Sequence, residues 1–146
     1  MGKNATPSPS VKARITHSFQ RQSLMTTLDA RIDDIAPGCV TISAPVTRHV
    51  LQQHGVAHAG MTFAIGDSAA GYSALSLMPD DHEVMTTEMK IHLLAPAQGE
   101  RLVARGRVIK PGRRLMIVQA DVFGQRNGEE VHVALLTGTM IPLPTK

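Results

Sequence analysis

The sequence predicts one α+β domain in which a curled antiparallel sheet wraps around one long central helix, with a short helix at the N-terminus. Three observations predict this fold. The chain has 146 residues, which is the length of one domain. Two alternating strand patterns come before an apolar helix, and four come after it. Because no other helix is long enough to cover the open face of such a sheet, we expect this helix to lie against the strands.

The elements before the long helix are short. Polar residues with Pro7 and Pro9 predict a flexible segment, and the single domain then occupies 11–146. Apolar spacing after Ser10 predicts an amphipathic helix, and two alternating stretches around a Pro37-Gly38 turn predict paired strands. The ranges are 1–10 for the flexible segment, Val11–Leu24 for the helix, and Thr27–Ile35 and Cys39–Ala44 for the strands.

The long helix, Gly60–Leu77, is apolar and rich in small residues, so its backbone can approach the strands closely. It spans about 27 Å. An Asn127-Gly128 pair predicts the hairpin turn before the last strand, which Pro142 and Pro144 are expected to close. The four strands expected after the helix are Met85–Leu93, Leu102–Ile109, Leu115–Phe123 and Val131–Ile141.

Composition excludes several classes of function. Hydrophobic residues make up 42% and charged residues 18%, a globular composition with a mild net charge of +3. The single cysteine, Cys39, excludes an intrachain disulfide and a cysteine-built zinc site. Aromatic residues are only 3%, which argues against a base-stacking nucleic-acid module. No secretory signal is visible, and Ala57–Met78 has too many Gly, Ser and Thr residues to span a membrane. We therefore expect a cytoplasmic protein with no nucleic-acid or membrane partner.

Asp67 is the most informative residue of the chain. It lies in the middle of the apolar helix, and no basic residue between Ala57 and Met78 can pair with it. Aspartate is a mediocre helix former, so local propensity does not explain its position. A half-buried carboxylate in an apolar wall tends toward a raised pKa, a frequent state for a general base or a nucleophile. The alternative is that Asp67 simply points into water.

The loop before the helix offers an anion site. It runs from Gln52 to Gly60 and ends at a helix start, where free N–H groups and the helix dipole favour negative charge. The backbone N–H groups of Ala59 and Gly60 are the best placed to bind such an anion. The anion could be a bound phosphate or the oxyanion of a carbonyl under attack. A carboxylate together with an oxyanion hole is suited to hydrolysis.

These residues also carry a family resemblance. His58-Ala59-Gly60, with Asp67 nine residues after the histidine, resembles the His-Gly-Gly…Asp signature of hotdog-fold acyl-CoA thioesterases of the phenylacetate-pathway type. The resemblance covers Asp29–Pro142 and extends to the order of the elements. It implies a hotdog fold and hydrolysis of acyl-CoA to the free acid and CoA.

The resemblance also implies residue roles. Asp67 would be the nucleophile or the base that activates water. The N–H of Ala59, which stands where the family has its first glycine, would bind the oxyanion. Gln52 would orient the thioester or the water, and Thr86 would stand beside the acidic residue. We expect His58 to hydrogen-bond at the helix start.

Substrate contacts follow from other positions. Phe63 and Tyr72 are expected to wall a pocket for an aryl or medium-chain acyl group, and Arg113 and Arg114 to contact the phosphates of CoA. No metal or cofactor is expected, because the His54 and His58 pair lies in a loop without further ligands. The basic residues also fit a solvated sheet face. They are Arg101, Arg105, Arg107, Lys110, Arg113 and Arg114. The alternative functions are an enoyl-thioester hydratase of the same fold and a non-catalytic acyl-thioester-binding module.

The spacing of the site residues predicts an assembly. Asp67 lies eight residues after Ala59, which places the two backbones about 12 Å apart on one helix. An aspartate side chain cannot cross that distance to a carbonyl bound at its own helix start. We therefore expect a homodimer with two shared sites. The resembled family forms such dimers with antiparallel helices and sheets joined edge to edge, and the assembly could extend to a dimer of dimers.

Overall fold

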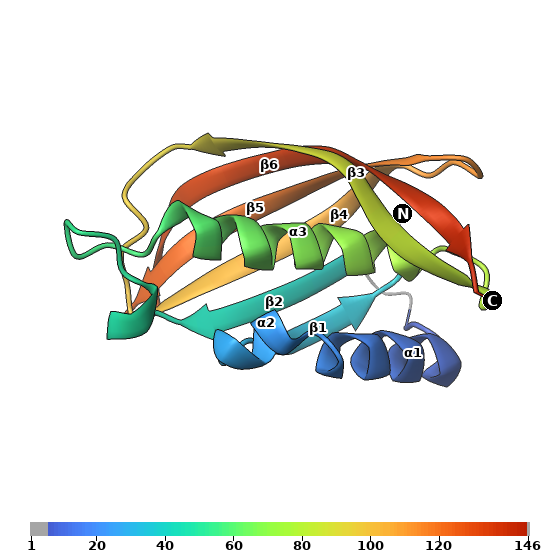
Figure 1. The fold of residues 1–146 in the computed structure, drawn as a ribbon, viewed down its shortest axis with the longest axis horizontal. Coiled ribbons are helices and arrows are strands. Elements are labelled where there is room, and N and C mark those ends of the chain that lie inside the picture. The colour runs from blue at the N-terminus through green and yellow to red at the C-terminus, as the bar shows by residue number, and fades with distance from the viewer. Residues whose placement is uncertain (1–5, 146) are drawn as a thin grey trace.

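Six antiparallel strands form one curled sheet, and a long helix lies along its concave face (Figure 1). The computed structural model describes residues 6–145, so the first half of the expected flexible segment, 1–5, lies outside the described residues. The strand order is β1-β2-β4-β5-β6-β3. The elements are α1 (Pro9–Gln20), α2 (Ser23–Thr27), β1 (Arg31–Ala36), β2 (Cys39–Pro45), the 3₁₀ helix η1 (Arg48–Val50), α3 (Ala59–Leu75), β3 (His82–Leu93), β4 (Arg101–Lys110), β5 (Met116–Arg126) and β6 (Glu129–Pro144).

Helix α3 lies very close to the strands. A Cβ atom added at Gly106 of β4 would come within 2.3 Å of the Ala69 carbonyl oxygen, so only glycine allows this approach. Side chains of α3 such as Ile65 and Leu75 are fully buried in the hydrophobic core. The predicted contact between a helix rich in small residues and the strands is confirmed.

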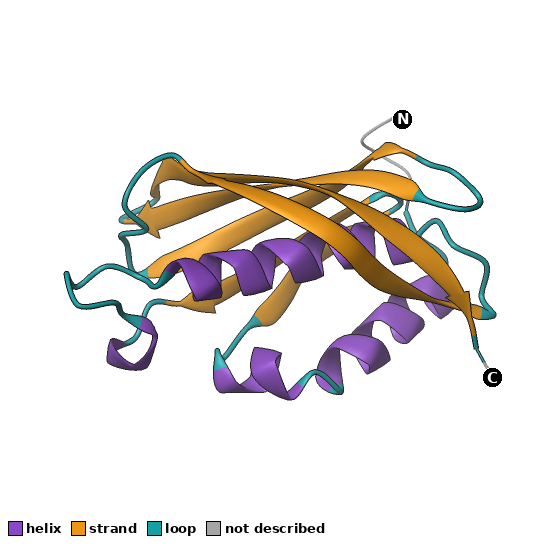
Figure 2. Cartoon of the chain, turned by 45° about the horizontal axis from the view of Figure 1, so that its top comes forward, coloured by secondary structure: helices purple, strands orange, loops and turns teal. Residues whose placement is uncertain are grey.

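The N-terminal helices pack beside α3, on the side away from the sheet (Figure 2). The guanidinium of Arg14 donates hydrogen bonds to the carbonyl oxygens of Leu75 at 2.7 Å, Met78 at 3.1 Å and Pro79 at 2.6 Å. These carbonyls lie at or just after the C-terminal end of α3, and two of them also accept backbone N–H groups, Leu75 from Met78 at 3.1 Å and Pro79 from His82 at 3.1 Å. Helix α1 therefore caps the C-terminus of the long helix.

Several predicted boundaries are wrong. Strand β3 begins at His82, where Met85 was expected, and β5 ends at Arg126, where Phe123 was expected. The helix expected at Val11–Leu24 divides into α1 and α2, because Gln22 takes an extended conformation with φ −80° and ψ 98°. The strand expected at Thr27–Ile35 begins only at Arg31, after Asp29 turns the chain with φ +50°. The last strand, expected at Val131–Ile141, continues through both of its prolines to Pro144. Strand β5 begins opposite Met140, so this stretch has a neighbour on one side only and tolerates proline.

The hairpin predicted at Asn127-Gly128 is confirmed. Both residues have positive φ, 51° and 79°, as a two-residue turn between antiparallel strands requires. They connect Arg126 to its partner Glu129. Among the described helices, none is both long and apolar enough to cross a membrane.

Candidate active site

Asp67 lies midway along α3 with its carboxylate against β3. The Thr86 hydroxyl donates a hydrogen bond to Asp67 Oδ1 at 2.8 Å, so the two residues that the family resemblance places side by side are in contact. Burial raises the pKa of Asp67, and the hydrogen bond from Thr86 acts in the opposite direction. The carboxylate is half-buried, forms no ion pair with another residue of 6–145, and lines a cavity.

That cavity has a volume of about 150 Å³ and a polar lining. Residues of the α1–α2 junction form one wall of it. Gln22 donates from Nε2 to the Tyr72 hydroxyl at 2.7 Å, and Ser68 donates to Gln22 Oε1 at 3.2 Å. Sequence reasoning missed Gln22 and Ser18, because nothing local shows that these residues reach side chains of α3 that lie 46 to 54 positions later. The lining residues are Ser18, Gln22, Asp67, Ser68, Gly71, Tyr72, Glu83, Val84 and Thr86.

The start of α3 is capped by a histidine. His58 is the N-cap residue, and its Nδ1 accepts the N–H of Gly60 at 2.8 Å, as expected for a histidine at a helix start. The Gly60 N–H is therefore already used, which corrects the expectation that it is free for an anion. The N–H of Ala59 has no hydrogen-bond partner within residues 6–145. Ala59 is the first helical residue and has no positive φ, so alanine fits without strain where the family has glycine.

A second and larger cavity, of about 770 Å³, opens beside this helix start. It lies between the loop at Gln52–Ala59 and the connection at 93–98 that follows β3, and it also touches Thr62. The carbonyl oxygen of the Gln52 side chain accepts a hydrogen bond from the backbone N–H of His54. The structure thus brings Gln52, His58 and Ala59 together at one cavity.

The two parts of the candidate site are separate within one chain. Asp67 and Thr86 line the smaller cavity, whereas Ala59 and Gln52 line the larger one, and no residue lines both. The eight-residue spacing along continuous helix keeps them about 12 Å apart. One chain therefore does not assemble the carboxylate and the free N–H at one point.

Tyr72 and Phe63, which were expected to wall a pocket for the acyl group, lie in different surroundings from each other. Tyr72 is only 3% exposed and lines the Asp67 cavity, but its hydroxyl is bonded to Gln22, and Ser18 Oγ lies 3.2 Å away. Phe63 is half-buried against the core. The cavity at Asp67 is therefore polar, where apolar walls were expected.

Arg113 and Arg114 are exposed in the β4–β5 turn. Arg113 lines an apolar cavity of about 510 Å³ that includes Met78 and His82, at the end of α3 nearest to the Asp67 cavity. Other basic residues face solvent in ion pairs, such as Arg105 with Glu130 at 2.7 Å. These paired residues fit the interpretation of a solvated sheet face.

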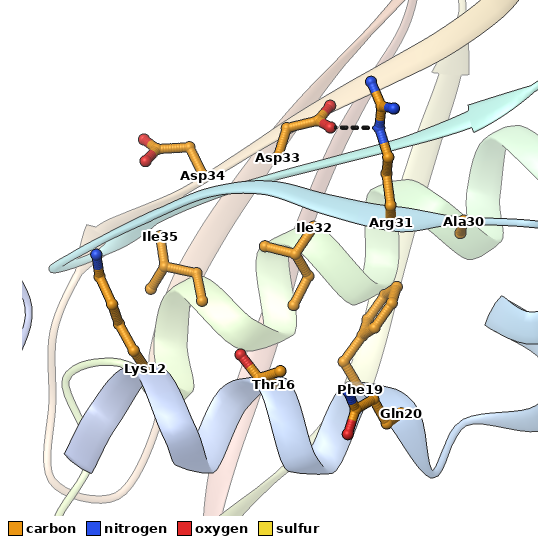
Figure 3. Close-up of a pocket in the computed structure, with 10 residues that line it drawn as sticks. All are labelled: Lys12, Thr16, Phe19, Gln20, Ala30, Arg31, Ile32, Asp33, Asp34 and Ile35. Carbon is orange, nitrogen blue, oxygen red and sulfur yellow. Dashed lines mark hydrogen bonds and ion pairs between the residues drawn. The ribbon is translucent and has the colours of Figure 1, made fainter. Parts of the chain in front are cut away.

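A further groove of about 430 Å³ lies between α1 and β1 (Figure 3). Lys12 and Phe19 approach it from the helix and Ile32 from the strand, whereas the Arg31–Asp33 ion pair, at 2.8 Å, points away from α1 at the edge of the groove. None of the predicted site residues lines it. The groove is therefore separate from the candidate active site.

Comparison with known proteins defines the class. A thioesterase from Silicibacter pomeroyi, described as a thioesterase family protein, superposes with a TM-score of 0.90 at 43% identity, covering 92% of this chain and 98% of that one. The E. coli PaaI protein from the phenylacetic acid degradation operon superposes with a TM-score of 0.84 over 97% of this chain and 99% of that one, at 19% identity. The fold is the hotdog fold, as the resemblance implied.

Sequence comparison gives the family. The model of the thioesterase superfamily matches residues 54–131. A Deinococcus radiodurans protein named "Putative esterase" is 33% identical over 114 residues, which are 77% of this chain and 74% of that protein. The chain belongs to the thioesterase superfamily, and its reaction is of the thioester-hydrolase class.

Proposed function

We propose that this protein hydrolyses acyl-CoA thioesters with an aryl or medium-chain acyl group, using Asp67 as its nucleophile or general base. The observation that carries the proposal is the half-buried Asp67 carboxylate. It has a raised pKa, a hydroxyl partner in Thr86 at 2.8 Å, and an adjoining polar cavity. Membership of the thioesterase superfamily supports the reaction class.

The polar cavity favours the general-base form of the mechanism. Its volume and lining suit water, which needs several polar partners to be held in place. A water oxygen would attack the thioester carbonyl carbon while its proton passes to the Asp67 carboxylate. The carbonyl oxygen becomes an oxyanion at the free N–H of Ala59, supplied by a second subunit. The C–S bond then breaks, and the thiolate of CoA leaves and takes up a proton.

Arg113 and Arg114 would bind the phosphates of CoA. Both are exposed in a turn at the end of α3 nearest to the Asp67 cavity, and guanidinium groups pair well with phosphate oxygens. Reversing both charges, Arg113→Glu with Arg114→Glu, should raise KM for acyl-CoA and leave kcat nearly unchanged. Hydrolysis of the matching acyl thioester of N-acetylcysteamine, which lacks the nucleotide, should not respond. An equal loss with both substrates would contradict this role.

Asp67→Asn tests the assignment of the carboxylate. Asparagine has nearly the same volume but can neither attack nor accept a proton, so kcat should fall by about 10²-fold or more. The assay measures thiol release from benzoyl-CoA and octanoyl-CoA, with the exposed Asp34→Asn as control. Near-normal turnover by Asp67→Asn would overturn the proposal. Absorbance change of an enoyl-CoA without thiol release would indicate the hydratase instead, and saturable binding without either would indicate a binding module.

A further inference from the structure

Thr62 carries a buried hydroxyl that lacks a partner. Its side chain is 0% exposed, and its Oγ1 forms no hydrogen bond within residues 6–145. A threonine hydroxyl inside a helix commonly bonds to the carbonyl four residues earlier, which here belongs to His58. Thr62 does not form that bond. A buried hydroxyl without a partner is unfavourable for folding, so its presence needs a reason.

The other buried hydroxyl side chains of the described chain have partners. Ser73 donates to the Ala69 carbonyl at 2.7 Å and accepts the Val40 N–H at 2.9 Å. Ser68 donates to Gln22, and Ser43 lies 3.3 Å from Arg101. Thr62 is thus the exception among them, and it belongs to the same helix as two of the satisfied residues.

Thr62 is placed next to the free N–H at the start of α3. It follows Ala59 by three residues, so the two lie on the same face of the helix. A helical side chain covers the turn that precedes its own Cα atom, which for Thr62 is the turn that begins with Ala59. Both residues line the cavity of about 770 Å³. The Gly60 N–H is bonded to His58, whereas the Thr62 hydroxyl has no partner within residues 6–145.

We propose that the Thr62 hydroxyl is the second oxyanion donor, forming a hydrogen bond to the thioester carbonyl oxygen beside the N–H of Ala59. The inference rests on the proposed thioester hydrolysis. The hydroxyl keeps its proton and stabilises the negative charge that develops on the oxygen during attack. Because Oγ1 is covered in the free chain, the side chain must turn about χ1 to reach the carbonyl oxygen when substrate binds, and the bond then strengthens as the charge grows.

The experiment compares Thr62→Val with Thr62→Ser. Valine keeps the shape and removes the hydroxyl, so kcat should fall by about 10²-fold with little change in KM. The Tm of Thr62→Val should stay the same or rise, because the variant removes an unsatisfied polar group. Thr62→Ser keeps the hydroxyl and should retain kcat within a few-fold. If Thr62→Val does not fold, Thr62→Ala is compared with Thr62→Ser instead. Both of these variants lack the threonine methyl group, so they differ only in the hydroxyl.

Ser73→Ala is the matched control, because it removes a buried hydroxyl that already has partners in the same helix. It should lower Tm and leave kcat unchanged, the reverse of Thr62→Val. Normal kcat in Thr62→Val, or parallel loss of kcat and Tm, would overturn the inference. Asp67→Asn is assayed alongside. If it is inactive while Thr62→Val is fully active, only the role of Thr62 fails, whereas an active Asp67→Asn removes the proposed function itself.

Discussion

At the scale of single residues, the charge of Asp67 depends on two opposing effects. Burial disfavours the carboxylate and raises its pKa, whereas the hydrogen bond donated by Thr86 favours the carboxylate and lowers its pKa. A base must be ionised to accept a proton. Activity should therefore fall as pH decreases through the raised pKa of Asp67.

Thr86→Ala should move that acid limb to higher pH. The variant removes the effect that lowers the pKa of Asp67 and leaves burial, so the carboxylate protonates at a higher pH than in the wild type. At the pH optimum the loss of kcat should be modest, because a supporting hydroxyl contributes about 1–2 kcal/mol. The measurement is kcat/KM across the pH range. Thr86→Ser, which keeps a donor, is the control, and an acid limb unchanged in Thr86→Ala would contradict the role of this bond.

At the scale of elements, α1 stabilises the helix that carries the site. Arg14 is the only described residue whose side chain donates to the carbonyls of Leu75, Met78 and Pro79. Arg14→Met keeps an unbranched apolar stem but leaves these carbonyls without that donor. The free energy of unfolding should fall by about 2 kcal/mol, the range for hydrogen bonds to a charged group. Denaturant unfolding measures the change. Lys12→Met, at an exposed position of the same helix, should stay within about 0.5 kcal/mol, and an equal effect of both variants would contradict the capping role.

Local sequence patterns predict the elements in which apolar residues recur at a single helical or strand spacing. The long helix, the hairpin at Asn127-Gly128 and strand β2 follow from apolar spacing and turn residues alone. The stretch at Thr27–Ile35 alternates regularly, yet its first residue belongs to α2, whose Met25 is buried in the core. Tertiary packing sets the boundary between α2 and β1, and the alternation of apolar and polar residues does not show it.

The residues of the candidate site also divide into those with a local sequence signal and those that depend on tertiary contacts. Asp67 and the cap at His58 were visible because their signals are local: a carboxylate in an apolar helix, and a histidine before a helix start. The contact with Thr86 required the family resemblance. Gln22 and Thr62 could not be predicted, since one depends on where the N-terminal helices pack and the other on a hydroxyl left without a partner.

At the scale of the whole molecule, the proposed function draws the Asp67 and the Ala59 of one complete site from two chains, because the two residues are separated along α3. Two variants can each remove one half of it. Asp67→Ala removes the carboxylate. Ala59→Pro removes the free N–H at the first helical position, where proline is well tolerated. His58, the preceding residue, is already extended with φ −62° and ψ 141°, which a following proline favours. Both variants should therefore fold, as circular dichroism will check.

Mixing the two variants tests the shared site. Each alone should be nearly inactive, because every site in its homodimer lacks either the base or the oxyanion donor. After the two are unfolded and refolded together, about half of the dimers should be mixed, and by two-fold symmetry each of these has one intact site and one doubly impaired site. Activity should then recover to about a quarter of that of the wild type. Mixing either variant with itself under the same conditions is the control and should restore nothing. If both variants fold and exchange subunits without any recovery, the carboxylate and the donor act within one chain, and the α3 spacing must be bridged by a movement of the helix start.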